Sequence, residues 1–162
     1  MKITKTKGFS LVEVVTVLAI FVIMASIASV YMSSYVNNTN LRTAARQLAS
    51  DIANSKQMSV TQGVNYRMTI TVGTPGQYTI EQRDAADTTS MVIATKIPTD
   101  SGAGLKIDST TYLNSTIYFQ QRGTTSLGEV VLKNSVCKAT ICSKATINST
   151  TTGKTYVTYI MQ

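Results

Sequence analysis

The sequence contains no histidine and no tryptophan, and it has only two prolines and two cysteines in 162 residues. Without histidine the chain cannot supply a Ser–His–Asp triad, a histidine general base or a histidine metal ligand. Its glycines follow neither the Walker nor the dinucleotide-binding spacing, and no carboxylate pair has a spacing that suggests acid–base chemistry. These absences argue against an enzyme, so we expect no catalytic residue, cofactor or metal.

Charged side chains are also absent from residues 14–41, and this long run follows a short basic segment that contains Lys2, Lys5 and Lys7. The part from Val14 to Tyr35 is mostly apolar and long enough to cross a bilayer, which requires about 20 residues. Positive charges before such a span place the amino terminus in the cytoplasm. Without these three lysines the net charge falls from +7 to +4, which is modest for the remaining domain.

The junction Gly8-Phe9-Ser10-Leu11-Val12-Glu13 resembles the class III signal of type IV pilins and type II secretion pseudopilins. An ordinary secretory signal is cleaved after its apolar segment, whereas this junction precedes the segment, which therefore stays in the mature protein. The resemblance implies that a prepilin peptidase cleaves between Gly8 and Phe9, that Phe9 is then N-methylated, and that Glu13 guides assembly with other pilins or pseudopilins.

This resemblance also divides the chain into three parts. It implies a leader over residues 1–8, a transmembrane and assembly helix over 9–36, and an extracytoplasmic pilin-like domain over 37–162. The product would be a single-pass inner-membrane protein with its carboxy-terminal domain in the periplasm, later assembled into a pilus or pseudopilus.

Glu13 stands at the start of the apolar segment, where a carboxylate is costly unless it has a partner. In a filament of stacked helices, the amino group of Phe9 in a neighbouring subunit could neutralise it and fix the axial register between subunits. The alternative is that Glu13 only lies at the membrane interface, where the positive end of the helix dipole favours an acid.

A second helical pattern continues beyond the membrane segment, since apolar residues from Leu41 to Ala53 recur at spacings of three and four. The opposite face carries Arg42, Arg46, Gln47, Asp51 and Lys56. No glycine or proline occurs from Phe9 to Gln62, and Gly63 is suited to end a helix. The pattern predicts one helix over residues 9–62, of which 37–62 is amphipathic.

After Gly63 the periodicity changes to two, which is typical of half-buried strands. The expected strands cover residues 66–72, 78–83, 91–97, 105–107, 117–119, 130–132, 139–147 and 156–160. Short Thr-, Val- and Tyr-rich strands of this kind predict a mostly antiparallel sheet over 64–162 that packs on the amphipathic helix. The expected fold class is α+β.

The later half is similar to the GspH/FimT type of minor pilins and minor pseudopilins. The matching segments are 117–119 followed by Gly123, 128–132, and 145–148 leading to Gly153. Here Lys154 stands in place of the usual arginine, and the turn directly before Gly123 contains no proline. The resemblance implies a minor subunit of a type IV pilus or type II secretion pseudopilus, at or near its tip.

Cys137 and Cys142 are five positions apart and have no histidine to complete a closed zinc shell. Outside the cytoplasm such a pair favours a disulfide over a metal site. We therefore predict a bond between Cys137 and Cys142.

Four lysines, Lys133, Lys138, Lys144 and Lys154, fall within 22 positions and suggest a possible surface for the phosphates of DNA. A DNA-binding minor pilin for DNA uptake is the alternative function. The competing interpretation, which we favour, is a solvated lysine face that keeps the domain soluble. A simple signal-anchored periplasmic protein is a third possibility, but it leaves Gly8, Phe9 and Glu13 unexplained.

Overall fold

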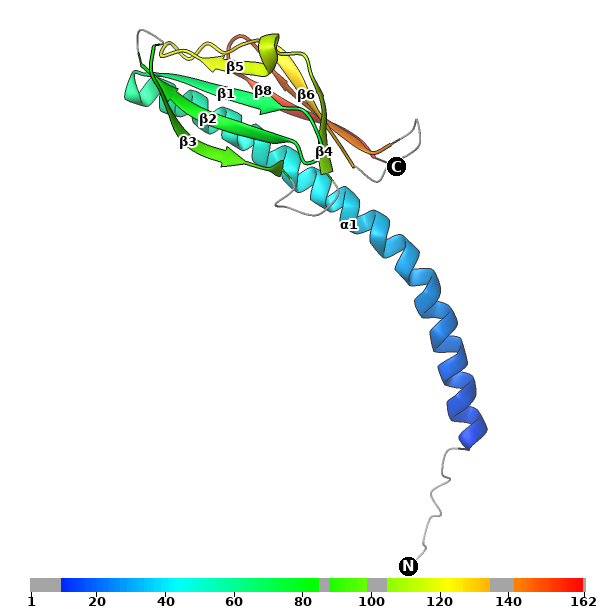
Figure 1. The fold of residues 1–162 in the computed structure, drawn as a ribbon. Coiled ribbons are helices and arrows are strands. Elements are labelled where there is room, and N and C mark those ends of the chain that lie inside the picture. The colour runs from blue at the N-terminus through cyan, green and yellow to red at the C-terminus, as the bar shows by residue number, and fades with distance from the viewer. Residues whose placement is uncertain (1–9, 85–87, 99–104, 135–141, 162) are drawn as a thin grey trace, which may run out of the picture. The chain divides into compact units, whose positions relative to one another are not determined.

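The computed structural model describes residues 10–84, 88–98, 105–134 and 142–161. The chain forms two compact units, Met1–Val36 and Asn37–Gln162, and helix α1 contributes to both. Figure 1 shows this helix and the strands that follow it.

Helix α1 runs from Leu11 to Gln62. Its first turn is closed by the Ser10 carbonyl, which accepts hydrogen bonds from the backbone N–H groups of Glu13 (3.0 Å) and Val14 (3.3 Å). It ends at Gly63, whose φ of +65° is a left-handed conformation that glycine adopts without steric cost. The expected end of the helix is therefore confirmed, while Phe9 lies outside the described residues.

In the described part of the chain, eight strands follow the helix: β1 (Asn65–Thr71), β2 (Gln77–Arg83), β3 (Ser90–Lys96), β4 (Leu105–Thr110), β5 (Thr116–Phe119), β6 (Gly128–Asn134), β7 (Lys144–Ser149) and β8 (Thr155–Ile160). Most begin or end within one to three residues of the expected strands. The expected strand 139–147 differs more, because β7 begins only at Lys144; residues 139–141 lie outside the described part.

The strands form two antiparallel four-stranded sheets rather than the single sheet expected from the sequence. One sheet has the order β3-β2-β1-β5 and the other β4-β6-β7-β8. Two backbone contacts join them: the Gly73 N–H donates to the Ile107 carbonyl at 3.1 Å, and the Thr125 N–H donates to the Thr151 carbonyl at 3.1 Å. The α+β class and the packing of a long helix on antiparallel strands are confirmed.

One hydrophobic cluster joins the second half of α1 to both sheets. The helix contributes Leu41, Ala44, Ala45, Leu48 and Ile52, each at most 1% exposed. Six of the strands contribute buried apolar side chains to the same cluster, including Tyr66, Met68, Tyr78, Ile107, Ile117, Phe119, Leu132 and Ile147. Each large apolar side chain buried in this way contributes about 1.5–3 kcal/mol. This cluster holds the helix and the two sheets of unit 37–162 together.

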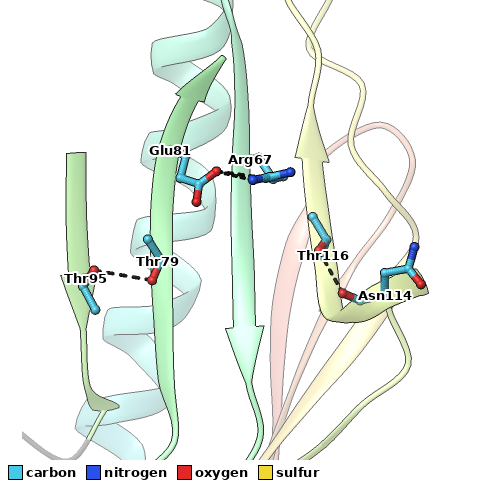
Figure 2. A network of polar contacts seen from close by, with 6 residues as sticks. All are labelled: Arg67, Thr79, Glu81, Thr95, Asn114 and Thr116. Atoms are coloured by element: carbon cyan, nitrogen blue, oxygen red, sulfur yellow. Dashed lines mark hydrogen bonds and ion pairs between the residues drawn. The ribbon is translucent and has the colours of Figure 1, made fainter. Parts of the chain in front are cut away.

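A short 3₁₀ helix, η2 (Leu113–Ser115), precedes β5 and was not expected from the sequence. Asn114 and Ser115 both have φ of 53°, a conformation that costs non-glycine residues about 1–2 kcal/mol each. The Thr116 hydroxyl donates to the Asn114 carbonyl at 2.9 Å and helps to hold the turn, as Figure 2 shows.

Candidate functional site

The first part of α1, residues 11–28, presents an apolar surface that no described residue buries. Residues Leu11–Ala28 have a mean hydropathy of 2.6, and none of them is buried. Large side chains such as Leu18 and Phe21 are 60% and 71% exposed. This is the one helical segment in the described part of the chain that is long and apolar enough to span a bilayer. Such a surface requires lipid or other apolar helices around it.

Two hydroxyl side chains in this segment are satisfied by the helix itself. Thr16 Oγ1 donates to the Val12 carbonyl at 2.8 Å and lies 2.9 Å from the Glu13 carbonyl. Ser26 Oγ donates to the Ile23 carbonyl at 2.7 Å. An unpaired hydroxyl in hydrocarbon costs several kcal/mol, so these bonds make Thr16 and Ser26 compatible with an apolar environment.

Glu13 lies in the first turn of α1, and its side chain is exposed. Its position near the helix amino terminus is electrostatically favourable. The other two residues of the expected processing site, Gly8 and Phe9, lie outside the described residues. The geometry therefore places the acid at the head of the apolar helix, and the cleavage, the methylation and the role of Glu13 stay predictions.

In the second half of α1, Asp51 departs from the expected polar face. It is 8% exposed, and its Oδ2 accepts a hydrogen bond from the Tyr78 hydroxyl at 2.6 Å. Lys96 Nζ lies 2.9 Å from both carboxylate oxygens. The helical pattern placed Asp51 on the solvent face. Its two partners could not be recognised from that pattern, because they lie 27 and 45 positions away in the sequence. Asp51 thus connects α1 to β2 and β3.

Lys56 also differs from the expectation of a solvated side chain. Its Nζ donates to the Thr152 carbonyl at 2.8 Å, in the turn between β7 and β8. Its stem crosses Gly153, where an added Cβ would lie 2.5 Å from the lysine Cδ, and it also passes Gly123. The two glycines that carried the resemblance to the GspH/FimT type therefore lie against one helix side chain.

Two of the lysines proposed for DNA binding lie side by side, but one of them is already paired. Lys133 on β6 is opposite Lys144 on β7. Lys133 Nζ is 2.6 Å from Asp108 Oδ2, and Lys106 Nζ is 2.9 Å from Oδ1 of the same carboxylate. The hydrogen bonds from Lys133 and then Lys106 hold the pKa of Asp108 below its usual value, against the opposing effect of partial burial. Part of the positive charge at this end of the sheet is thus neutralised.

Lys154 lies at the other end of β7 and β8, because Ser149 pairs with Thr155 while Lys144 pairs with Ile160. At about 3.3 Å per residue, five residues of β7 separate the two ends by roughly 17 Å. Lys138 is outside the described residues. The described lysines of the predicted set do not form one cluster.

Cys137 lies outside the described residues, so its bond with Cys142 stays a prediction. Within the described part of the chain, no group of three or more His, Cys, Asp or Glu side chains is placed to hold a metal ion.

Comparison with known proteins gives two results that agree with this geometry. The prokaryotic N-terminal methylation motif matches residues 3–29. The fold is similar to two solved structures of the minor pseudopilin EpsH from the type II secretion system of Vibrio cholerae. The TM-scores are 0.59 and 0.58, at 11% and 10% identity, and each match covers 74% of this chain and 96% or 94% of the other. No curated protein sequence matches the chain.

The similarity to EpsH, at 11% and 10% identity, shows a shared fold. The recognition made from Gly8-Phe9 and Glu13 is confirmed by the methylation motif at residues 3–29, and the pilin-like fold is confirmed by the similarity to EpsH.

Proposed function

We propose that this chain is a minor pilin or pseudopilin that assembles through its N-terminal helix into a type IV pilus or a type II secretion pseudopilus, at or near the tip. Prepilin peptidase cleaves between Gly8 and Phe9, and the new amino-terminal Phe9 is methylated. The helix first lies in the inner membrane, with residues 37–162 on the periplasmic side, and then moves into the filament beside other pilins or pseudopilins.

The observation that carries this proposal is the exposed apolar surface of residues 11–28, which begins with an acid in the first helical turn. Each Å² of such apolar surface that leaves water stabilises the new environment by about 25 cal/mol. Burial of the helix in lipid or against neighbouring helices is therefore strongly favoured. Hydrophobicity alone does not select a position along a filament axis. A charged pair between Glu13 and the amino group of a neighbouring Phe9 would do so, because a displaced helix leaves both charges unpaired.

The placement at or near the tip is supported by the likeness of the later half to the GspH/FimT type, and by no single residue. DNA uptake is a weaker alternative for this domain, because Lys133 is paired with Asp108 and Lys154 lies at the far end of the sheet.

The substitution Glu13→Val separates insertion from assembly. We expect the variant to enter the membrane normally, because insertion depends on hydrophobicity, and to be lost from the sheared filament fraction. Val17→Leu is the matched control, since it changes the same helix without changing charge and should leave incorporation unchanged.

Mass spectrometry of the same fractions tests the processing step. The expected amino terminus is N-methylated Phe9. An intact Met1 in cells with an active prepilin peptidase would contradict the proposed function, and normal incorporation of Glu13→Val would return Glu13 to a merely interfacial role.

A further inference from the structure

The part of α1 that belongs to unit 37–162 has one side that faces away from the strands. Figure 1 shows the strands along its other side, where the buried stripe from Leu41 to Ile52 packs on them. The side away from the strands consists of exposed residues that recur at spacings of three and four, and therefore lie in one row on the helix. This row, which we call the arginine face, is formed by Arg42, Arg46, Ser50, Ala53 and Gln57.

The charge that remains on this side of the helix is entirely positive. Asp51 and Lys56, which the helical pattern also placed on the polar side, are both bonded to other parts of the domain. Arg42 and Arg46 remain, and neither forms an ion pair with a described residue of the chain. No aspartate or glutamate occurs between Glu13 and Asp51. The helix itself therefore supplies no counter-ion for the two arginines.

The stability of the domain does not explain this arrangement. Arg42 and Arg46 are four positions apart, and like charges at this spacing repel each other and destabilise a helix. Three acids of the described domain are already engaged in ion pairs elsewhere, namely Asp51, Glu81 and Asp108. The positive charge of the arginine face is thus left for a group outside the chain.

The chemistry of the arginine face fits a carboxylate of another protein. The planar guanidinium group forms two parallel hydrogen bonds with a carboxylate, and arginine is the preferred cation of ion pairs at interfaces. Beyond Arg46 the face continues with the short side chains of Ser50 and Ala53. Short side chains at a contact allow two helices to approach closely. A helix with acidic side chains in a facing row would therefore match both the charge and the shape of this surface.

The same face of a second copy of this chain does not meet that requirement. It carries the same two arginines and no acid, so a contact between the two faces would bring like charges together, which opposes association. The complementary helix therefore belongs to a different chain. A preference for an unlike neighbour agrees with a minor subunit, which does not form a filament from its own copies.

We propose that the arginine face binds the amphipathic helix of a different prepilin-type subunit, and that aspartate or glutamate side chains of that helix pair with Arg42 and Arg46. This inference rests on the proposed function, because assembly through N-terminal helices brings the helices of neighbouring subunits side by side. In that arrangement Glu13 fixes the axial register, and the two arginines select which subunit is the neighbour.

A photo-cross-linking residue on the arginine face tests the contact in the full-length chain. Benzoylphenylalanine replaces Ser50, one helical turn after Arg46, and cells that assemble filaments are irradiated. We expect a cross-linked peptide from another protein with a prepilin junction, from the helix directly after its apolar segment, and with aspartate or glutamate in that peptide. A cross-link to a second copy of this chain, to a protein without such a junction, to lipid or to nothing would overturn the proposal.

Reversal of the two charges tests the arginines themselves. Arg42→Glu together with Arg46→Glu should lower the cross-link from position 50 about tenfold or more, which corresponds to at least about 1.4 kcal/mol. Arg42→Lys together with Arg46→Lys keeps the charge and should retain most of the cross-link. Arg122→Glu together with Lys154→Glu is the matched control, because it changes the net charge equally at exposed positions in the turns after β5 and β7. This control should leave the cross-link unchanged.

Two further measurements separate a lost ion pair from a damaged domain. Urea unfolding of the reversed chain should match that of the wild type, since exposed charges contribute little to stability. Lysine in place of the cross-linked acids of the partner should restore the cross-link of the reversed chain and weaken that of the wild-type chain. An unchanged cross-link after reversal, or no restoration after this exchange of charges, contradicts the pairing.

Failure of this proposal can be distinguished from failure of the proposed function. A chain that is methylated at Phe9 and present in filaments, but gives no cross-link from position 50 to another prepilin-type subunit, disproves only the contact of the arginine face. A chain that gives this cross-link in membranes but retains Met1 and never enters filaments disproves the proposed function and leaves the contact standing.

Discussion

The two halves of helix α1 have the same secondary structure but opposite relations to their surroundings. Residues 11–28 have no buried side chain, whereas Leu41, Ala44 and Leu48 are almost completely buried. The first half is apolar on all sides, and the second is apolar along one stripe. A stripe can be covered by strands of the same chain, while an all-round apolar helix needs an apolar environment from outside. Sequence periodicity therefore indicates whether the partner of a helix is internal or external.

The largest expected difference between the two halves is in the effect of removing a leucine. Leu48→Ala should lower the free energy of unfolding of the domain by about 2–5 kcal/mol, because it opens a cavity in a well-packed core. Leu18→Ala should change it by less than about 0.5 kcal/mol, since Leu18 is 60% exposed. Urea unfolding of the full chain in a mild detergent measures both. Equal effects would show that the first half of the helix also packs on the domain.

Removal of Asp51 tests the polar contact of the buried half. Asp51→Ala should destabilise the domain by about 1–3 kcal/mol, because the buried Tyr78 hydroxyl loses this acceptor and Lys96 its counter-ion. Asn54→Ala, an exposed position one turn further along the helix, is the control. In a double-mutant cycle, Tyr78→Phe should cost less in the Asp51→Ala background, and strict additivity would refute the coupling.

Two glycines with left-handed backbones lie in different environments: Gly63 follows the end of α1 in open space, and Gly153 packs against the Lys56 side chain of the same helix. Gly63→Ala meets no atom within 4 Å and should cost about 1–2 kcal/mol from backbone strain alone. Gly153→Ala has the same strain, and its Cβ also meets the Lys56 stem, so it should cost more. The excess should diminish in a Lys56→Ala background. Thermal unfolding of the four variants decides this, and equal costs for the two glycines would contradict the contact.

The smallest effect is expected for Asp108, on the solvent side of the second sheet. Its lowered pKa means that its ion pairs stabilise the fold above its ordinary pKa of 3.8, and that this contribution is lost as the pH falls through the lower folded value. The contribution should be about 1 kcal/mol or less, as for other partly exposed ion pairs. The difference in unfolding free energy between wild type and Asp108→Asn should be constant near neutral pH and vanish in acid. A difference in unfolding free energy that increased in acid would contradict the lowered pKa of Asp108.

The sequence allowed the helix, its end at Gly63 and most strands to be predicted, because these depend on local periodicity and turn residues. It did not predict which strands pair. Thr116–Phe119 returns to β1, and Leu105–Thr110 joins β6 in a second sheet, although both show the same alternation as their neighbours. The roles of Asp51 and Lys56 were missed for the same reason, since their partners are far away in the sequence. Of the candidate site, the apolar segment followed from composition and Glu13 from the resemblance of its junction to a class III signal, whereas the pairing of Lys133 with Asp108 required the fold.

The hydroxyl groups of Thr16 and Ser26 have a consequence for how such a helix changes its surroundings. Each hydroxyl donates a hydrogen bond to a backbone carbonyl of the preceding turn. Neither therefore needs a water molecule or a neighbouring chain as an acceptor. A helix prepared in this way has no hydrogen bond of these side chains to break when lipid tails around it are replaced by protein. In the proposed function, bilayer and filament interior would then make the same demand on these two hydroxyl groups, and Glu13 would be the side chain that distinguishes the two environments. Replacing lipid by protein around Thr16 and Ser26 would then change mainly the dispersion contacts of these two side chains.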